Sequence, residues 1–204
     1  MKKFIISIDA GTTSNRSILF DLKGKPIFSS QKEFTQFFPK NGWVEHDPEE
    51  IWKTTIKTLR DVIQKADKLK GEILTIGITN QRETTVLWDK KTGKTVYRAI
   101  VWQDRRTEDY CKKLRKQNKD TAIFNKTGLL IDPYFSGTKI KWILDNVPKA
   151  KYLMSRNQLL FGTIDSFLIW RLTKGKVHAT DATIASRTMI YNISSNKWDD
   201  AILN

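Results

Sequence analysis

The first eighty residues read as three strands followed by a helix, and this order limits the folds open to the chain. Residues 3–9 are an apolar, β-branched run that stops at a turn cluster of Asp, Gly, Thr, Ser and Asn. Residues 16–21 form a second run, and residues 26–34 form a third after the turn at 22–25. Consecutive strands joined by short turns pair antiparallel, so this pattern predicts a three-stranded meander.

A helix start signal follows the third strand. Asp47 is a suitable N-cap, Pro48 suits the first helical position, and the two glutamates that follow complement the positive end of a helix. Apolar residues then recur at helical spacing as far as Ala66, and we expect Gly71 to end the helix.

The rest of the chain alternates between strand and helix patterns. Strands are predicted at 73–79, 86–89 and 99–103, with a turn at 90–93, and helices are predicted up to about 119, at 138–145 and at 164–172, the last ended by Gly175. This order indicates an α/β fold of the ribonuclease H-like type found in actin-type ATPases, with a mixed sheet flanked by helices. We expect one such N-terminal domain over residues 1–204.

Composition narrows the class of protein further. With 39% hydrophobic residues and seven tryptophans, the 204-residue chain has the composition of a folded domain. No apolar run approaches the roughly 18 residues of a membrane span, so no span is expected. The single cysteine, Cys111, has no partner for an internal disulfide, which suits a reducing, cytoplasmic location.

The net charge of +14 is compatible with binding to nucleic acid or to a membrane surface, or with a lysine-rich solvated exterior. The lysines are scattered rather than clustered, and no zinc-finger, helix-turn-helix or RNA-binding pattern accompanies them. We therefore expect no nucleic-acid partner.

The turn after the first strand has the residue types of a phosphate loop. Gly11 is followed by Thr12, Thr13 and Ser14, which supply converging backbone N–H groups and hydroxyl donors. It differs from a Walker A loop, because no lysine follows at the required spacing and a strand comes next instead of a helix. Taken alone, the segment is better explained as an ordinary hairpin turn, in which Gly, Thr, Ser and Asn are all common.

In a nucleotide kinase each of these residues would contact a different part of the Mg²⁺–ATP complex. Asp9 would hold Mg²⁺ through water, because that ion keeps much of its hydration shell. The three hydroxyl residues would bind the phosphates, and Arg16 would add positive charge near them.

A second group has the residue types of a pocket for a small polyol. Arg82 and Glu83 follow a predicted strand and offer a cationic donor and an anionic acceptor for hydroxyl groups. Trp102 is a candidate wall for the carbon atoms, and Tyr134 could supply a hydroxyl and a ring edge. Each residue also has an ordinary interpretation, as a surface charge, a core side chain or a turn residue.

Longer motifs decide between these interpretations. The chain closely resembles glycerol kinases of the FGGY family of carbohydrate kinases along almost its whole length. The matching segments are 9–14, 42–48, 78–85, 99–103, 105–107, Gly128, 132–142, 160–163, Trp170 and 185–189. Residues 134–146 also resemble the family-wide FGGY pattern, with Lys139 and Trp142 at its fixed positions.

The resemblance implies a role for each candidate residue. It places Arg82, Glu83, Trp102 and Tyr134 against glycerol. It also places Thr12, Thr13, Ser14 and Arg16 at the phosphates of ATP or ADP, and Asp9 near Mg²⁺.

Two positions depart from the family pattern. Ala10 stands where glutamine is common, which puts the importance of a side chain at this point of the phosphate loop in doubt. Asp104 stands where a small residue is frequent, and we expect Arg105 and Arg106 to neutralise it.

The remaining reactive side chains receive no functional role. His46, in a predicted turn, and His178, in a predicted strand, have no partners at metal-ligand spacing. Cys111 is expected to be a structural or exposed thiol rather than a nucleophile.

The resemblance also implies that parts of the enzyme lie outside these residues. In the family the catalytic base is an aspartate of a later segment, and the adenine pocket belongs to a second, C-terminal domain. We therefore expect the chain to be truncated and inactive by itself. Another FGGY kinase, acting on xylulose, ribulose or gluconate, and a non-catalytic polyol-binding module stay open as alternatives, as does a homo-oligomer of the full-length protein.

Overall fold

The computed structural model describes residues 2–203, which form two compact units. Unit 1 consists of Met1–Gln36 and His46–Gln81, and unit 2 of Phe37–Glu45 and Arg82–Asn204. The two ends of the expected domain, Met1 and Asn204, lie outside the described residues.

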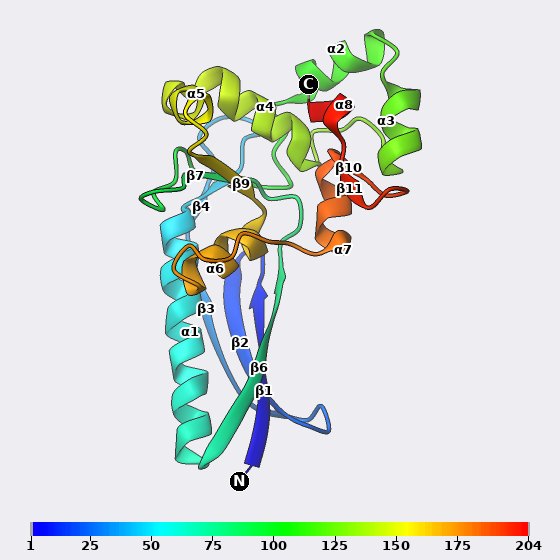
Figure 1. Cartoon of the computed structure of the whole chain (residues 1–204). Coiled ribbons are helices and arrows are strands. Elements are labelled where there is room, and N and C mark those ends of the chain that lie inside the picture. Colours follow the sequence, from blue (N-terminus) through cyan, green and yellow to red (C-terminus); the bar gives the residue numbers. More distant parts are fainter. Residues whose placement is uncertain (1, 204) are drawn as a thin grey trace. The chain divides into compact units, whose positions relative to one another are not determined.

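Unit 1 is built on a mixed four-stranded sheet in the order β3-β2-β1-β6 (Figure 1). The strands are β1 (Lys2–Ala10), β2 (Ser14–Asp21), β3 (Pro26–Glu33) and β6 (Gly71–Asn80). The first three pair antiparallel, as the turn signals predict, whereas β6 pairs parallel with β1. The predicted meander is confirmed, and its phosphate-loop segment connects β1 to β2.

Helix α1 (Pro48–Lys68) covers one face of this sheet (Figure 1). Its N-cap is Asp47, whose Oδ1 accepts a hydrogen bond from the backbone N–H of Glu49 at 2.9 Å. The buried face of α1 includes Ile51, and the matching face of β1 includes Ile6; both are fully buried. The expected helix start is therefore confirmed.

The end of α1 differs from the expectation. Lys70, not Gly71, adopts the left-handed conformation that ends the helix, with φ 53°. Gly71 already belongs to β6, where a Cβ atom would lie 2.1 Å from the ring of Phe4. The glycine is thus needed for a close approach between strand and ring.

Unit 2 combines short strands with several helices. Strand β7 (Val86–Asp89) pairs antiparallel with β9 (Leu159–Gly162), and β8 (Ala99–Ile100) is a further short strand. Strands β4 (Gln36–Phe37) and β5 (Glu45–His46) lie where the chain passes between the units, and each has one residue in unit 1. The other elements are α2 (Glu108–Lys116), α3 (Asp120–Thr127), α4 (Ser136–Asn146), α5 (Pro148–Ser155), α6 (Ile164–Leu172), α7 (Ala182–Ala185), a 3-10 turn (Ser186–Thr188), β10 (Tyr191–Asn192), β11 (Lys197–Trp198) and α8 (Asp200–Leu203).

Several predictions for unit 2 need correction. The strand expected at 99–103 ends at Ile100, and the chain then turns, with the N–H of Asp104 donating to the carbonyl of Val101 at 3.0 Å. The helix expected to reach about 119 stops at Lys116, because Asn118 takes a left-handed conformation. His178 lies in no strand, and helices α3 and α5 were not anticipated.

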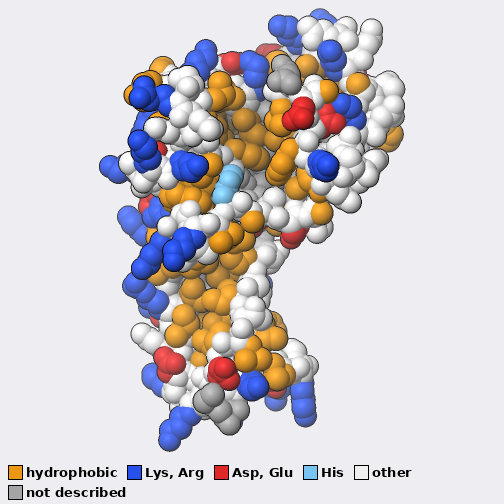
Figure 2. All heavy atoms as spheres, in the orientation of Figure 1, with side chains coloured by type: hydrophobic (Ala, Val, Ile, Leu, Met, Phe, Trp, Pro, Cys, Tyr) orange, Lys and Arg blue, Asp and Glu red, His pale blue; other side chains and the backbone are white. Residues whose placement is uncertain are grey.

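Lys and Arg side chains lie on both units, interspersed with uncharged and apolar side chains (Figure 2). Among residues 2–203, no helix is long and apolar enough to cross a membrane.

Candidate functional site

The predicted phosphate loop of unit 1 is a tight turn between β1 and β2. The N–H of Gly11 donates to the carbonyl of Ser14 at 3.0 Å, and a Cβ atom on Gly11 would lie 3.1 Å from that oxygen. Only glycine fits this turn without displacement. Ser14 is the first residue of β2, so the loop proper is shorter than the motif, and the exposed Thr13 lies at its tip.

Asp9 and Arg16 face each other across the two strands beneath this turn. They are register partners, and their side chains form an ion pair at 3.0 Å. Both remain accessible, with 38% of the Asp9 side chain and 45% of the Arg16 side chain exposed. Because an exposed ion pair is weakly held, either group can turn to a ligand at low energetic cost.

The donor set at Asp9 is compatible with a hydrated Mg²⁺. No cluster of three His, Cys, Asp or Glu side chains suited to a metal occurs between residues 2 and 203. Mg²⁺ needs no such cluster, since it is commonly held by one or two carboxylates, water and substrate phosphates. The accessible carboxylate of Asp9, beside the predicted phosphate loop, is compatible with that requirement.

In unit 2, Glu83 is held in an unusual conformation. It is buried, with 3% of its surface exposed, and its φ of 65° is left-handed, which costs a non-glycine residue about 1–2 kcal/mol. Its carbonyl accepts hydrogen bonds from the hydroxyls of Ser136 (3.1 Å) and Thr85 (3.2 Å). Such a conformation persists only where the surrounding structure holds the residue in place, as these hydrogen bonds do for Glu83.

The counter-charge of Glu83 comes from Arg187, which the sequence analysis did not select. The Arg187 Nε donates to Oε1 of Glu83 at 2.7 Å. Its guanidinium also lies 5.8 Å from the ring centre of Tyr134 and 5.0 Å from that of Phe135. The only available signal was its place in the 185–189 motif, because 104 residues separate the two charges.

The aromatic candidates meet beside this ion pair. The rings of Trp102 and Tyr134 lie 5.5 Å apart at 60° to each other, and both residues are half-buried. The backbone N–H of Trp102 donates to the hydroxyl of Thr84 at 3.3 Å, which links it to the Glu83 segment. Arg82 is exposed next to Glu83. Unit 2 thus brings Trp102 and Tyr134 into contact and connects Tyr134 to Glu83 through Arg187, whereas Arg82 adjoins Glu83 in the chain.

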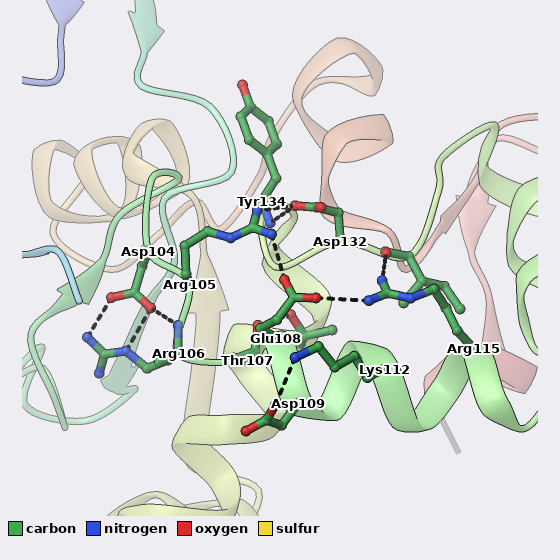
Figure 3. Close-up of polar contacts among 12 residues, drawn as sticks. Asp104, Arg105, Arg106, Thr107, Glu108, Asp109, Lys112, Arg115, Asp132 and Tyr134 are labelled. Carbon is green, nitrogen blue, oxygen red and sulfur yellow. Dashed lines mark hydrogen bonds and ion pairs between the residues drawn. The ribbon is translucent and has the colours of Figure 1, made fainter. Parts of the chain in front are cut away.

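A buried ionic cluster supports the Trp102 turn, and it corrects one expectation. Asp104 is 1% exposed, accepts from the backbone N–H of Val44 at 2.6 Å, and pairs with Arg106 at 2.8 Å. The side chain of Arg106 is fully buried; it also pairs with Glu45 at 2.8 Å and lies 3.8 Å from the ring centre of Trp43. Only one of the two arginines therefore neutralises Asp104 (Figure 3).

The other arginine supports the segment that carries Tyr134. Arg105 points away from Asp104 and pairs with Asp132 at 2.9 Å and with Glu108 at 2.6 Å (Figure 3). Asp132 also accepts a hydrogen bond from the backbone N–H of Tyr134 at 2.8 Å. The two adjacent arginines thus hold two different segments, one with Trp102 and one with Tyr134.

Lys139 is buried beneath the same segment. Its Nζ donates to the backbone carbonyls of Tyr134 and Phe135, the second at 3.3 Å. Burial lowers the pKa of Lys139 to about 7, although Asp104 and Glu83 act in the opposite direction. This signature lysine therefore fixes the backbone of the aromatic residues.

Two further expectations have clear outcomes. Cys111 is fully buried in α2, and burial raises the pKa of its thiol to about 11, as suits a structural cysteine. His46 is not in a turn but in β5, fully buried, and burial lowers its pKa to about 4.

Comparison with known proteins confirms the family resemblance. Residues 4–204 match the N-terminal domain of the FGGY family of carbohydrate kinases. Over 203 residues the chain is 59% identical to a glycerol kinase of Malacoplasma penetrans, and equally to one of Alkaliphilus metalliredigens. These matches cover 100% of this chain but 40% and 41% of the relatives, so the chain spans about two fifths of their length.

Solved structures confirm the expected fold. A Plasmodium falciparum glycerol kinase determined with ADP superimposes with a TM-score of 0.93 at 37% identity, covering 98% of this chain and 40% of the other. A Lactobacillus acidophilus gluconate kinase superimposes with a TM-score of 0.87 at 27% identity, covering 100% and 39%. The chain is therefore homologous to the N-terminal part of these kinases.

Proposed function

The chain belongs to the FGGY family of carbohydrate kinases, and from that premise we propose that the whole protein is a glycerol kinase. It would transfer the γ-phosphate of ATP to glycerol and release sn-glycerol 3-phosphate and ADP. A cytoplasmic location and a homo-oligomeric state of the whole protein belong to the same proposal.

The observation that carries the proposal is the convergence of residues in unit 2. Arg82 offers several N–H donors, and Glu83 offers carboxylate acceptors. Each hydroxyl group of a polyol both donates and accepts hydrogen bonds, so it can use both side chains. The rings of Trp102 and Tyr134, 5.5 Å apart, offer an apolar wall for three carbon atoms. Two charged side chains and two aromatic rings together offer the contacts that a small triol needs.

The residues of unit 1 would serve the phosphates. Phosphate oxygens would accept hydrogen bonds from the backbone N–H groups of Thr12 and Thr13 and from the hydroxyls of Thr12, Thr13 and Ser14. The guanidinium of Arg16 would leave Asp9 and pair with a phosphate instead. Mg²⁺, held through water by Asp9, would neutralise charge on the transferring group. The base that accepts the hydroxyl proton and the adenine pocket would lie in the rest of the protein.

A substrate panel on the full-length protein tests this function. We expect kcat/KM for glycerol to exceed that for xylulose, ribulose and gluconate by at least about a hundredfold, the discrimination open to a site built to hydrogen-bond its substrate. A higher value for any of the three sugars would assign the protein to a sister activity of the family.

Residues 1–204 alone should show no ATP-dependent formation of glycerol 3-phosphate above a blank without protein. Calorimetry with glycerol on the same chain addresses the alternative of a polyol-binding module. Tight glycerol binding by a full-length protein that lacks turnover would favour the module over the kinase.

A further inference from the structure

We propose that His46 is a positioning residue for the phosphate loop, which it orients through Gln36 and Gln81. The inference rests on the proposed function for the identity of the ligand, a polyphosphate, but its structural content is independent of turnover. All the residues concerned belong to unit 1.

Two glutamine side chains hold two successive carbonyl groups of the loop. The Nε2 of Gln81 donates to the carbonyl of Gly11 at 3.0 Å. The Nε2 of Gln36 donates to the carbonyl of Thr12 at 3.1 Å. The backbone of Gln81 is itself fixed, because its N–H donates to the carbonyl of Ala10 at 2.8 Å.

His46 joins the two glutamines. Its Nε2 lies 2.6 Å from Oε1 of Gln36, and its Nδ1 lies 3.3 Å from Nε2 of Gln81. The imidazole ring is fully buried and packs edge-on against Phe34, with ring centres 5.0 Å apart. One side chain therefore touches both groups that hold the loop.

The chemistry of these atoms allows one arrangement of protons. An amide nitrogen only donates, so Nδ1 of His46 must accept from Gln81. Oε1 of Gln36 only accepts, so Nε2 of His46 must carry the proton. With its oxygen engaged in this way, Gln36 turns its NH₂ group toward Thr12. A neutral ring suits a buried site, where burial lowers the pKa to about 4.

Because the peptide bond is planar, a hydrogen bond that fixes a carbonyl group also fixes the direction of the next N–H group. In a trans peptide the C=O of one residue and the N–H of the next point in opposite directions. Fixing the carbonyls of Gly11 and Thr12 therefore fixes the N–H groups of Thr12 and Thr13, which point away from the glutamines. These are the amides that a phosphate would need.

The competing interpretation is a core histidine that merely satisfies its own hydrogen bonds. It predicts that loss of His46 lowers stability without changing the direction of the loop amides. The two interpretations thus differ in a spectroscopic readout and in a kinetic one.

Nitrogen-15 NMR of the 204-residue chain supplies the first readout and needs no variant. We expect His46 to remain a single neutral tautomer, protonated at Nε2, throughout pH 5–8. A proton on Nδ1, or titration near the ordinary histidine pKa of about 6.5, would overturn the proposal. This measurement stands even if the protein proves to have another activity.

Two variants test the consequence for the loop. His46→Phe keeps the ring and its packing but loses both hydrogen bonds, whereas His46→Gln retains one donor and one acceptor. We expect His46→Phe to shift the amide signals of Thr12 and Thr13, and His46→Gln to restore them in part. The control is His178→Phe, the only other histidine, which is exposed in unit 2. Unchanged loop signals in a folded His46→Phe chain would contradict the proposal.

Kinetics of the full-length protein separate positioning from general destabilisation. Loss of the aimed amides should lower kcat/KM for ATP by roughly tenfold, while KM for glycerol stays within about twofold. Equal losses for both substrates would leave only the structural role. If the wild type shows no kinase activity, the proposed function fails, and the NMR readouts still decide the role of His46.

Discussion

Arg82 and Glu83 are neighbours in the chain but have opposite surroundings. Glu83 is buried and paired with Arg187, whereas Arg82 is exposed. Within residues 2–203 no side chain pairs with the exposed guanidinium of Arg82, which can therefore form new hydrogen bonds with a ligand. The buried carboxylate, by contrast, is held ready in one orientation.

In the full-length protein, Arg82→Ala should raise KM for glycerol by more than about tenfold. A lost hydrogen bond to a charged group typically costs roughly 1.5–3 kcal/mol. KM for ATP should change little, because the proposed role of Arg82 is to bind the polyol and not the nucleotide. Arg60→Ala, at an exposed position of α1, serves as the control and should leave both constants unchanged. An unchanged KM for glycerol would show that Arg82 does not bind glycerol.

Arg187 and Glu83 should be coupled in stability. Arg187→Met leaves a buried carboxylate without its counter-charge, and we expect the free energy of unfolding to fall by about 1–3 kcal/mol. The estimate is modest because 33% of the Arg187 side chain is exposed. Urea denaturation of the single variants and of the double variant with Glu83→Gln gives the coupling energy. Additivity within about 0.3 kcal/mol would show that the pair contributes nothing.

At the scale of elements, helix α1 is fixed both by its N-cap and by side-chain hydrogen bonds to β2. It begins at a cap whose geometry is complete, with Asp47 Oδ1 accepting from Glu49 at 2.9 Å. Side chains of β2 fasten it to the sheet: Asn15 donates to the carbonyl of Ile51 at 2.9 Å, and the hydroxyls of Ser17 and Thr58 lie 2.9 Å apart. The helix thus supports the strand that leaves the phosphate loop.

Asp47→Ala should lower the free energy of unfolding by about 1 kcal/mol, because a helix N–H loses its acceptor. Asp47→Asn is the matched control and should cost much less, since asparagine caps about as well. The measurement is the urea midpoint at constant m-value. Equal losses for the two variants would show that charge, and not the capping hydrogen bond, matters at this position.

At the scale of the whole molecule, a buried neutral histidine makes stability depend on pH. The unfolded chain binds a proton at His46 below about pH 6.5, whereas the folded chain does so only below about 4. Between these values the unfolded state binds more protons, so stability falls as pH decreases. The loss reaches up to about 3 kcal/mol near pH 4.

Comparison with His46→Phe isolates this contribution, because the carboxyl groups titrate equally in both proteins. We expect the stability advantage of the wild type to shrink as pH falls from 7 to 4.5. Parallel curves for wild type and His46→Phe would refute the assigned protonation of His46.

Local chemistry was sufficient for much of the fold. The sequence alone determined the meander, the start of α1, strand β7 and helix α6, because each depends on turn residues, caps and apolar periodicity within a few positions. It also identified Arg82, Glu83, Trp102 and Tyr134 through a family motif. Their roles toward glycerol, and those of the phosphate-loop residues, stay predictions.

Only the tertiary structure decided which charged and polar side chains meet. The pairing of Arg187 with Glu83 spans 104 residues, and the contact of Val44 with Asp104 spans 60. Such pairs leave no local pattern, because folding creates them by bringing distant backbone segments together. The same holds for His46, which has no ligand-like spacing in sequence yet joins Gln36 of β4 to Gln81, the residue that follows β6. Burial then decides its protonation: between about pH 4 and pH 6.5 the buried ring of His46 is neutral, whereas an exposed histidine would be charged.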